Sequence, residues 1–120
     1  MSVRLREGHR VYVYSEYVDM RAGFQRLSFH VREKMKQDLL EGDLFLFVGK
    51  SRKLLKAICY DGTGLLLIGK LLEQGKFMKL EMIEDFKLNV DELDTLLRGG
   101  VIRRSKFGRS ALTTQSRSLR

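Results

Sequence analysis

Three apolar runs separated by short polar turns constrain the fold more than any other feature of this sequence. The runs occupy Leu44–Val48, Leu54–Tyr60 and residues 65–72, and a further turn at 73–76 precedes a fourth apolar run at 77–80. Connections this short permit hairpins, because parallel pairing needs a long crossover. The second turn, Asp61-Gly62-Thr63-Gly64, is a strong signal for a tight turn. The sequence therefore predicts an antiparallel β-meander with four strands.

An amphipathic helix is expected ahead of the meander. Its apolar residues are Met20, Phe24, Leu27, Val31 and Met35. Spacings of three and four residues place them on one face of a helix of about four turns, which ends near residues 37–42. Asp19 is the expected N-cap, and Phe24 is expected to pack inward. A short β-type run at residues 11–14 precedes this helix.

A second helix signal follows the meander. Asn89 stands where an N-cap belongs, and Glu92, three residues later, completes a capping box. Gly99 and Gly100 then end the helix. The predicted fold class is α+β: an antiparallel β-meander sheet packed by one long helix, plus a short C-terminal helix. We expect one domain over residues 1–102 and a basic tail at 103–120.

Charge is distributed unevenly along the chain. The net charge of +8 comes from 23 basic and 15 acidic residues. Residues 103–120 hold six basic residues and no acid, so this tail is expected to be disordered when alone and to bind polyanions. Residues 50–79 hold seven basic residues against two acids, and residues 81–94 hold six acids against one lysine. We therefore expect a basic and an acidic region on the folded part.

Basic side chains near the hairpin turns and in the tail are candidates for contacts with DNA phosphates, since each such contact releases condensed counterions. The candidates are Arg21, Lys50, Arg52, Lys53, Lys56, Lys70, Lys76, Arg103, Arg104, Lys106 and Arg109. A second interpretation stays open for the hairpins, in which their charges form an ordinary solvated surface. For the tail, the alternative is a terminus with no binding role.

The sequence predicts no catalytic residue, no bound metal and no cofactor. Asp19, Asp61 and Glu73 would bind metal ions only if the fold brought all three together. Each already has an expected local role in a cap or a turn. His9 and His30 lack the spacing of a zinc site, so we expect surface or partly packed imidazoles.

The single cysteine, Cys59, excludes an internal disulfide and a multi-cysteine metal site. It lies inside an expected strand, where we predict a buried structural thiol. The N-terminus lacks the pattern of a signal peptide, and no apolar run is long enough to span a membrane. We therefore expect a cytoplasmic protein with no membrane partner.

Two gapped motifs resemble those of one protein family. Residues 18–27 read V-D-M-R-A-G-F-Q-R-L, similar to the pattern V-D-M-R-x-G-F-x-x-L. Residues 56–77 read K-A-I-C-Y-D-G-T-G-L-L-L-I-G-K-L-L-E-Q-G-K-F, similar to K-x-x-x-(W/Y)-D-x-x-G-x-x-L-x-x-K-x-L-E-x-G-x-F. The family is TnpB, the second-reading-frame protein of transposons of insertion-sequence family sixty-six, distinct from the RNA-guided nuclease of the same name. One departure is Leu71, where many members have arginine.

The resemblance implies a bacterial transposon accessory protein, encoded beside a separate transposase that carries the acid-triad chemistry. We expect it to assist DNA transposition by binding DNA, the transposase or both through basic hairpins and the tail, without being an enzyme. The alternative is a protein-interaction subunit of the transposase complex that uses the acidic residues 81–94 and an exposed sheet edge. Pairing of such an edge with itself would give a homo-oligomer. Arg21 is expected in the helix's first turn, with Asp61, Glu73 or a phosphate as its partner.

Overall fold

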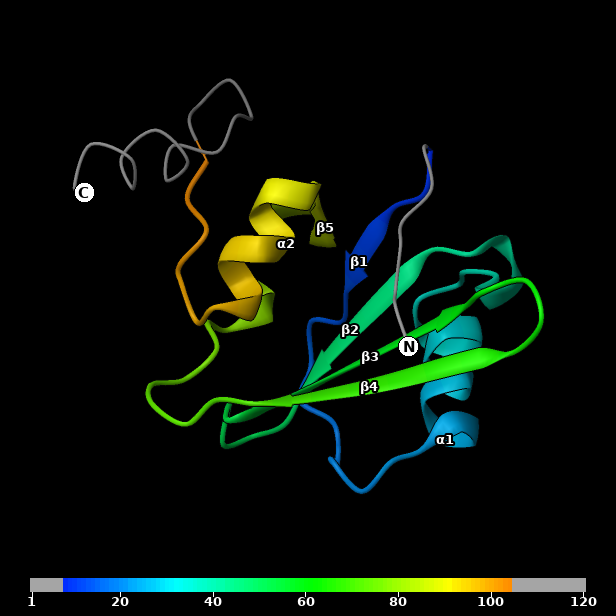
Figure 1. Ribbon diagram of the computed structural model, residues 1–120, viewed down its shortest axis with the longest axis horizontal. Helices are drawn as coiled ribbons and strands as arrows, with labels where there is room; N and C mark the ends of the chain where they lie inside the picture. Colours follow the sequence, from blue (N-terminus) through cyan, green and yellow to red (C-terminus); the bar gives the residue numbers. More distant parts are fainter. Residues whose placement is uncertain (1–7, 105–120) are drawn as a thin grey trace.

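The computed structural model describes residues 8–104, which form one mixed sheet and two short α-helices (Figure 1). The strands are β1 (Val11–Val13), β2 (Leu44–Val48), β3 (Leu54–Tyr60), β4 (Leu65–Leu71) and β5 (Lys87–Leu88). The α-helices are α1 (Phe24–Phe29) and α2 (Val90–Leu97), and the π-helix η1 (His30–Lys34) continues α1. Single 3-10 turns lie at η2 (Leu39–Glu41), η3 (Leu80–Met82) and η4 (Glu84–Phe86).

The strand order is β4-β3-β2-β1-β5. β2, β3 and β4 pair antiparallel in chain order, as the short turns require. β1, however, pairs parallel with β2 and antiparallel with β5. The predicted antiparallel meander is therefore wrong for the sheet as a whole and holds only for β2 to β4. The reason is α1, which lies between β1 and β2 in the chain and provides the crossover that a parallel pair needs.

The apolar run at residues 77–80 is not a strand, contrary to the prediction. Phe77 is 0% exposed and Leu80 is 4% exposed, so the run is buried in the core without joining the sheet. Its backbone meets the β2–β3 turn instead, because the N–H of Phe77 donates to the carbonyl of Arg52 at 2.7 Å. A short apolar run can be buried in the core with or without pairing in a sheet, so its sequence pattern does not distinguish a strand from an irregular segment.

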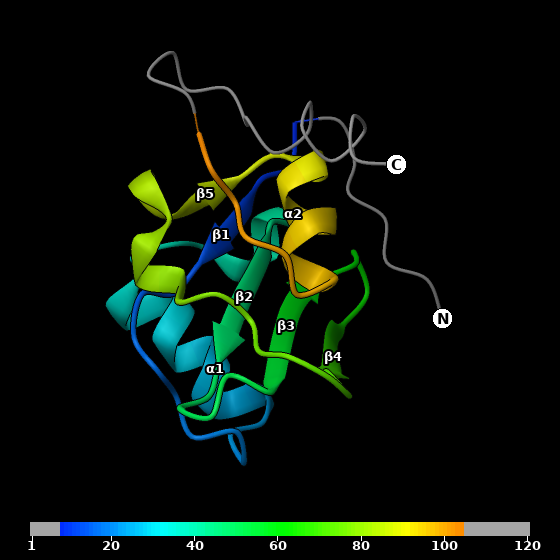
Figure 2. The same cartoon turned by 90° about the vertical axis from the view of Figure 1, so that its left-hand side faces the viewer.

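Apolar side chains cover both faces of the sheet, and each face packs against one helix (Figure 2). Leu44, Leu46 and Val48 of β2 lie in the core on the side of α2, together with Leu96. Phe45 and Phe47 lie in the core on the side of α1, together with Leu27 and Val31. This alternation explains why β2 is apolar at every position, since both of its faces are buried.

The first helix is shorter than predicted. It begins at Phe24 with Gly23 as N-cap, and α1 and η1 together span residues 24–34. Asp19 is not its N-cap; its Oδ1 accepts the Arg21 backbone N–H at 2.9 Å and closes a turn before the helix. Leu27 and Val31 are fully buried as predicted, whereas Phe24 is 47% exposed and does not pack into the core.

Local signals elsewhere are confirmed. Asn89 Oδ1 accepts the N–H of Glu92 at 2.7 Å, and Glu92 Oε1 accepts the N–H of Asn89 at 3.0 Å, which is the predicted capping box. Gly99, at a φ of +82°, ends α2. Cys59 is buried, and burial raises the pKa of its thiol.

Candidate nucleic-acid interface

The loop at residues 18–23 is held against the end of β2. The N–H of Val18 donates to the carbonyl of Val48 at 3.2 Å, and Lys56 Nζ donates to the carbonyl of Ala22 at 2.8 Å. A Cβ atom at Gly49 would lie 2.5 Å from Cγ of Met20, so the contact between the loop and the β2–β3 turn needs glycine there. These contacts fix the loop that carries Arg21.

The β2–β3 turn connects this loop to the segment that follows β4. Arg52 has a φ of +60°, and its N–H donates to the carbonyl of Gly49 at 2.9 Å. Its Nη1 also donates to the carbonyl of Phe77 at 3.3 Å. Three segments far apart in the sequence therefore meet at the end of the sheet where β2 and β4 end and β3 begins (Figure 1).

Basic side chains gather at this end of the sheet, which we call the basic end. Its members are Arg21, Lys50, Arg52, Lys53, Lys76, Lys79 and Arg103. All are exposed except Arg52 and Lys53, which are partly buried. All but Arg21 belong to the basic segments 50–79 and 103–120 of the sequence, but their arrangement in one region depends on the fold.

A groove of about 550 Å³ crosses the basic end. Its described lining includes four basic residues, Arg52, Lys76, Lys79 and Arg103, and no acidic one. The lining also includes Met82 and Val101, which are 70% and 46% exposed. A polyanion lying in this groove would meet cations supplied by three segments of the chain.

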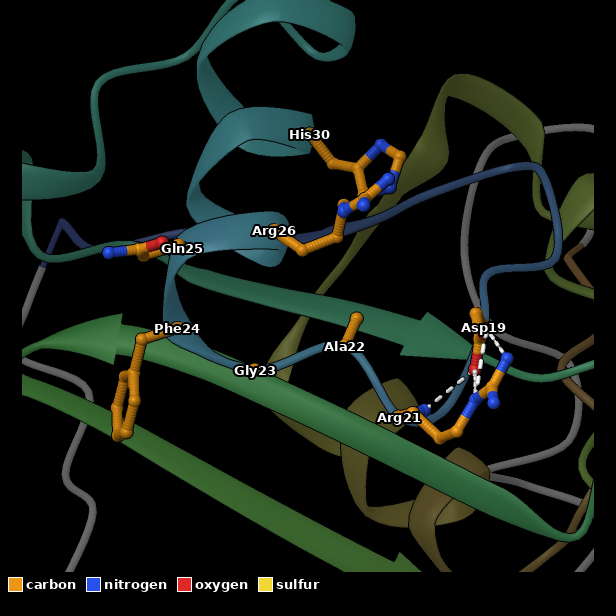
Figure 3. Close-up of a pocket in the computed structure, with 8 residues that line it drawn as sticks. All are labelled: Asp19, Arg21, Ala22, Gly23, Phe24, Gln25, Arg26 and His30. Atoms are coloured by element: carbon orange, nitrogen blue, oxygen red, sulfur yellow. Dashed lines mark hydrogen bonds and ion pairs between the residues drawn. The ribbon is translucent and has the colours of Figure 1, made fainter.

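A second hollow, of about 750 Å³, lies where the loop at residues 18–23 leads into α1 (Figure 3). Eight residues line it: Asp19, Arg21, Ala22, Gly23, Phe24, Gln25, Arg26 and His30. Arg21 pairs with Asp19 at 2.7 Å, rather than with Asp61 or Glu73, and it precedes α1 instead of lying in its first turn. The Arg21 guanidinium lowers the pKa of Asp19 to about 2. Arg21 nevertheless remains 92% exposed, so its charge is accessible from solvent.

His30 contributes a packed, neutral imidazole to this hollow. Its ring lies 5.2 Å from that of Tyr14 and 6.0 Å from that of Phe47, between centroids. Burial lowers the pKa of His30, and the nearby charges of Arg26 and Lys34 lower it further. Its Nδ1 atom is buried without a hydrogen-bond partner among the described residues. This agrees with the expectation of a partly packed histidine.

Three other candidate residues lie away from the groove or are engaged within the fold. Lys56 is partly buried and donates to Ala22, as described above. Lys70 is exposed, but it lies on the α2 face of β4 beside an apolar groove. Arg104 is only 17% exposed and forms an ion pair with Glu92 at 2.8 Å. Lys106 and Arg109 lie outside the described residues, as does most of the expected tail.

Two basic residues of this surface were not among the sequence candidates. Arg26 lines the second hollow, and Lys79 lines the groove. Arg26 lies off the apolar stripe of the predicted helix, and that signal could have identified an outward-facing cation. Lys79 counted toward the basic excess of residues 50–79, but the expected strand at 77–80 gave no reason to select it.

Two of the three acidic residues considered for metal binding, Asp19 and Asp61, have local roles. Asp61 Oδ1 accepts the N–H groups of Thr63 and Gly64, both at 2.9 Å, which confirms its role in the turn. These hydrogen bonds lower the pKa of Asp61. Within residues 8–104, no three His, Cys, Asp or Glu side chains form a group that could hold a metal ion. The same part of the chain has no helix of the length and apolarity needed to cross a bilayer.

Comparison with protein families matches this chain to a known group. The model of the family described as IS66 Orf2 like protein covers residues 9–107. The chain belongs to this family. The resemblance expected from the two motifs is thereby confirmed. In this IS66 Orf2-like protein the two motifs touch, because Lys56 of the second donates to Ala22 of the first.

Two relatives come from Sinorhizobium fredii (strain NBRC 101917 / NGR234). Uncharacterized protein y4hO is 44% identical over 69 residues, which cover 58% of this chain and 60% of the relative. Uncharacterized protein y4jC is 38% identical over 71 residues, which cover 59% of this chain and 61% of the relative. The matches thus span about three fifths of each relative. No solved structure matches the chain.

Proposed function

We propose that this IS66 Orf2-like protein assists DNA transposition by binding duplex DNA through its basic end. The observation that carries the proposal is the groove in which Arg52, Lys76, Lys79 and Arg103 converge from three segments of the chain. Membership of the family supports the transposon context. The family description and the relatives' names state no binding partner, so the proposal rests on the charge and shape of this surface.

The charge balance at the basic end favours a polyanionic partner. The seven basic residues of the basic end outnumber the acids of the same segments, which are Asp19, paired with Arg21, and the exposed Glu73 and Glu81. Long lysine side chains on an exposed surface reach phosphates without a large change of the backbone, and each contact gains from counterion release. The arrangement suits contact with the DNA backbone, and such contacts carry no sequence information. We therefore expect binding that depends strongly on salt and weakly on sequence.

Fluorescence anisotropy of a labelled duplex tests the proposal. The full chain should bind at low salt, with log K falling linearly against log salt. Lys76→Gln with Lys79→Gln should weaken binding and reduce the magnitude of the slope by about 2, since each phosphate contact contributes about 1. The matched control, Lys34→Gln with Lys36→Asn, removes two exposed lysines at the end of η1 and just after it. Asparagine is used at Lys36 because φ there is +58°.

The control variant should keep the wild-type slope. Equal effects of the two double variants would mean that binding follows net charge and not the groove, and the proposal would fail. Absence of binding by the full chain at low salt would also overturn it.

The second candidate function is docking to the transposase without DNA contact. The observation that favours it is the acidic stretch at residues 81–94, where Glu81, Glu84 and Asp91 are exposed. In that case isothermal titration with purified transposase should give a signal that Glu81→Gln with Glu84→Gln weakens. The groove variant should leave that signal unchanged.

A further inference from the structure

The two edges of the sheet are unequal (Figure 1). β5 forms one edge with two residues, whereas β4 leaves seven residues along the other. β4 pairs with β3 over its whole length in one continuous register. Folded proteins usually protect such an edge with charges, proline, bulges or short strands. β4 has none of these except one charge, Lys70.

The hydrogen bonds between β3 and β4 show which backbone groups face outward. The N–H of Leu72 donates to Lys53, and the carbonyl of Gly64 accepts from Asp61. In an antiparallel pair, both backbone groups of a residue point to the same side, and the side alternates along the strand. The backbone N–H and carbonyl groups of the even-numbered residues of β4 therefore point toward β3. The odd-numbered residues face away from it, where no described strand lies: Leu65, Leu67, Gly69 and Leu71.

We propose that β4 pairs antiparallel with β4 of a second copy of this chain, across a two-fold axis at Ile68. The outward-facing residues are symmetric about Ile68. In this register Leu65 lies opposite the second copy's Leu71, and Leu67 lies opposite its Gly69. Each outward N–H and carbonyl then meets a complementary group, and the interface is the same on both copies. The same pairing would place the two five-stranded sheets in one continuous sheet.

The side chains of β4 suit a second copy. Leu71 is 66% exposed, and the side chain of the second copy's Leu65 would cover it on the same face. Lys70 would lie opposite the second copy's Leu66, so like charges are not directly opposed. No proline, bulge or pair of like charges interrupts this register, so a second copy fits β4 along its whole length, and this favours a homodimer over another partner.

An apolar groove next to β4 would be extended by the same pairing. The groove, of about 400 Å³, lies between the sheet and α2, and Ile68 and Lys70 form its β4 side. Because the axis passes at Ile68, the second copy's Ile68 lies beside it on the α2 face. Apolar lining from Leu55, Leu93 and Leu97 would then continue across the interface. The groove therefore adds apolar contact to the backbone pairing.

Sedimentation equilibrium of the full chain tests the dimer. The wild type should approach twice the 14.0 kDa mass of one chain as its concentration rises. Leu71→Lys places a cation opposite a leucine, and Gly69→Pro removes an outward N–H. Each should raise the dissociation constant of the dimer by about tenfold or more. The matched control is Phe86→Lys, because Phe86 is 42% exposed and directly precedes β5, the opposite edge of the sheet. It should dimerise as the wild type does.

Hydrogen exchange of the wild type gives an answer even where a variant does not fold. The amides of Leu66, Ile68 and Lys70 should be protected at all concentrations, because they donate to β3. The amides of Leu65, Leu67, Gly69 and Leu71 should become protected only as the dimer forms. A monomer at all concentrations would overturn the proposal. A dimer with unprotected odd-numbered amides would overturn it too, and so would their protection in a monomer, which would mean that another segment covers β4.

Discussion

Arg104, the last described residue, holds its end of the chain against α2 and β5. Its replacement should destabilise the fold. Its guanidinium donates to Glu92 Oε2 at 2.8 Å and Oε1 at 3.0 Å, to the carbonyl of Glu84 at 2.9 Å, and to the carbonyl of Lys87. Glu92 is 3% exposed, while Arg104 is 17% exposed. Arg104→Met would keep the volume of the side chain but leave the Glu92 carboxylate buried without its cation.

The expected cost follows from the burial of Glu92. Removal of one partner from a buried ion pair costs about 3–5 kcal/mol. Two features place Arg104→Met near the lower limit: the exposure of Arg104, and the hydrogen bond from the Asn89 N–H that Glu92 keeps. We expect a loss of about 3 kcal/mol in the free energy of unfolding. For a domain of this size, each kcal/mol lowers Tm by about 4–8 °C, so Tm should fall by at least about 12 °C.

Urea unfolding followed by circular dichroism measures this loss, and Arg98 provides the control. Arg98 forms an ion pair with Asp94 on the same helix, but both side chains are more than 60% exposed. Arg98→Met should therefore cost less than about 1 kcal/mol. The double variant Arg104→Met with Glu92→Gln should lose less free energy of unfolding than the two single variants lose together, because the two residues are coupled. If Arg104→Met costs no more than Arg98→Met, the argument from buried charge is refuted.

Three further changes test other parts of the fold. Burial keeps the pKa of His30 below its value in the unfolded chain. The unfolded chain therefore binds more protons, and the free energy of unfolding falls as pH drops below about 6.5. His30→Phe should reduce this fall, measured as the urea midpoint against pH. Lys56→Met should cost about 1–2 kcal/mol in urea unfolding, because the carbonyl of Ala22 loses its charged donor. Gly49→Ala should cost about 1–3 kcal/mol in thermal unfolding, and Met20→Ala in the same chain should recover part of it, since Met20 occupies the space of the new Cβ.

The elements predicted correctly from the sequence have local signals. The turn at residues 61–64 forms because the Asp61 side chain accepts N–H groups two and three residues later. The start of α2 forms because Asn89 and Glu92 bond to each other's backbone. Both interactions lie within four residues of sequence, so the residue types and their spacing are enough to predict them.

The elements that were wrongly predicted depend on contacts distant in sequence. Asp19 had the right type for an N-cap, but it lies five residues before Phe24, the first residue of the helix, and its side chain closes a separate turn. β1 lies between β2 and β5, and residues 87–88 gave no strand signal that would reveal this place. Arg104 was selected as a free cation of the tail, and only the fold brings it to Glu92, twelve residues earlier.

The strand directions connect DNA binding at the basic end with the pairing of β4. The basic end lies where β4 ends, and antiparallel pairing reverses the second copy's β4. The two basic ends would therefore lie at opposite ends of the continuous sheet, where each could bind its own duplex. A dimer should bridge two duplexes, and energy transfer between a donor-labelled and an acceptor-labelled duplex should report it. Gly69→Pro should abolish this transfer while leaving the affinity for a single duplex unchanged, because it changes no charge and Gly69 lies outside the groove. Transfer that persists in the monomeric variant would show that bridging does not depend on β4.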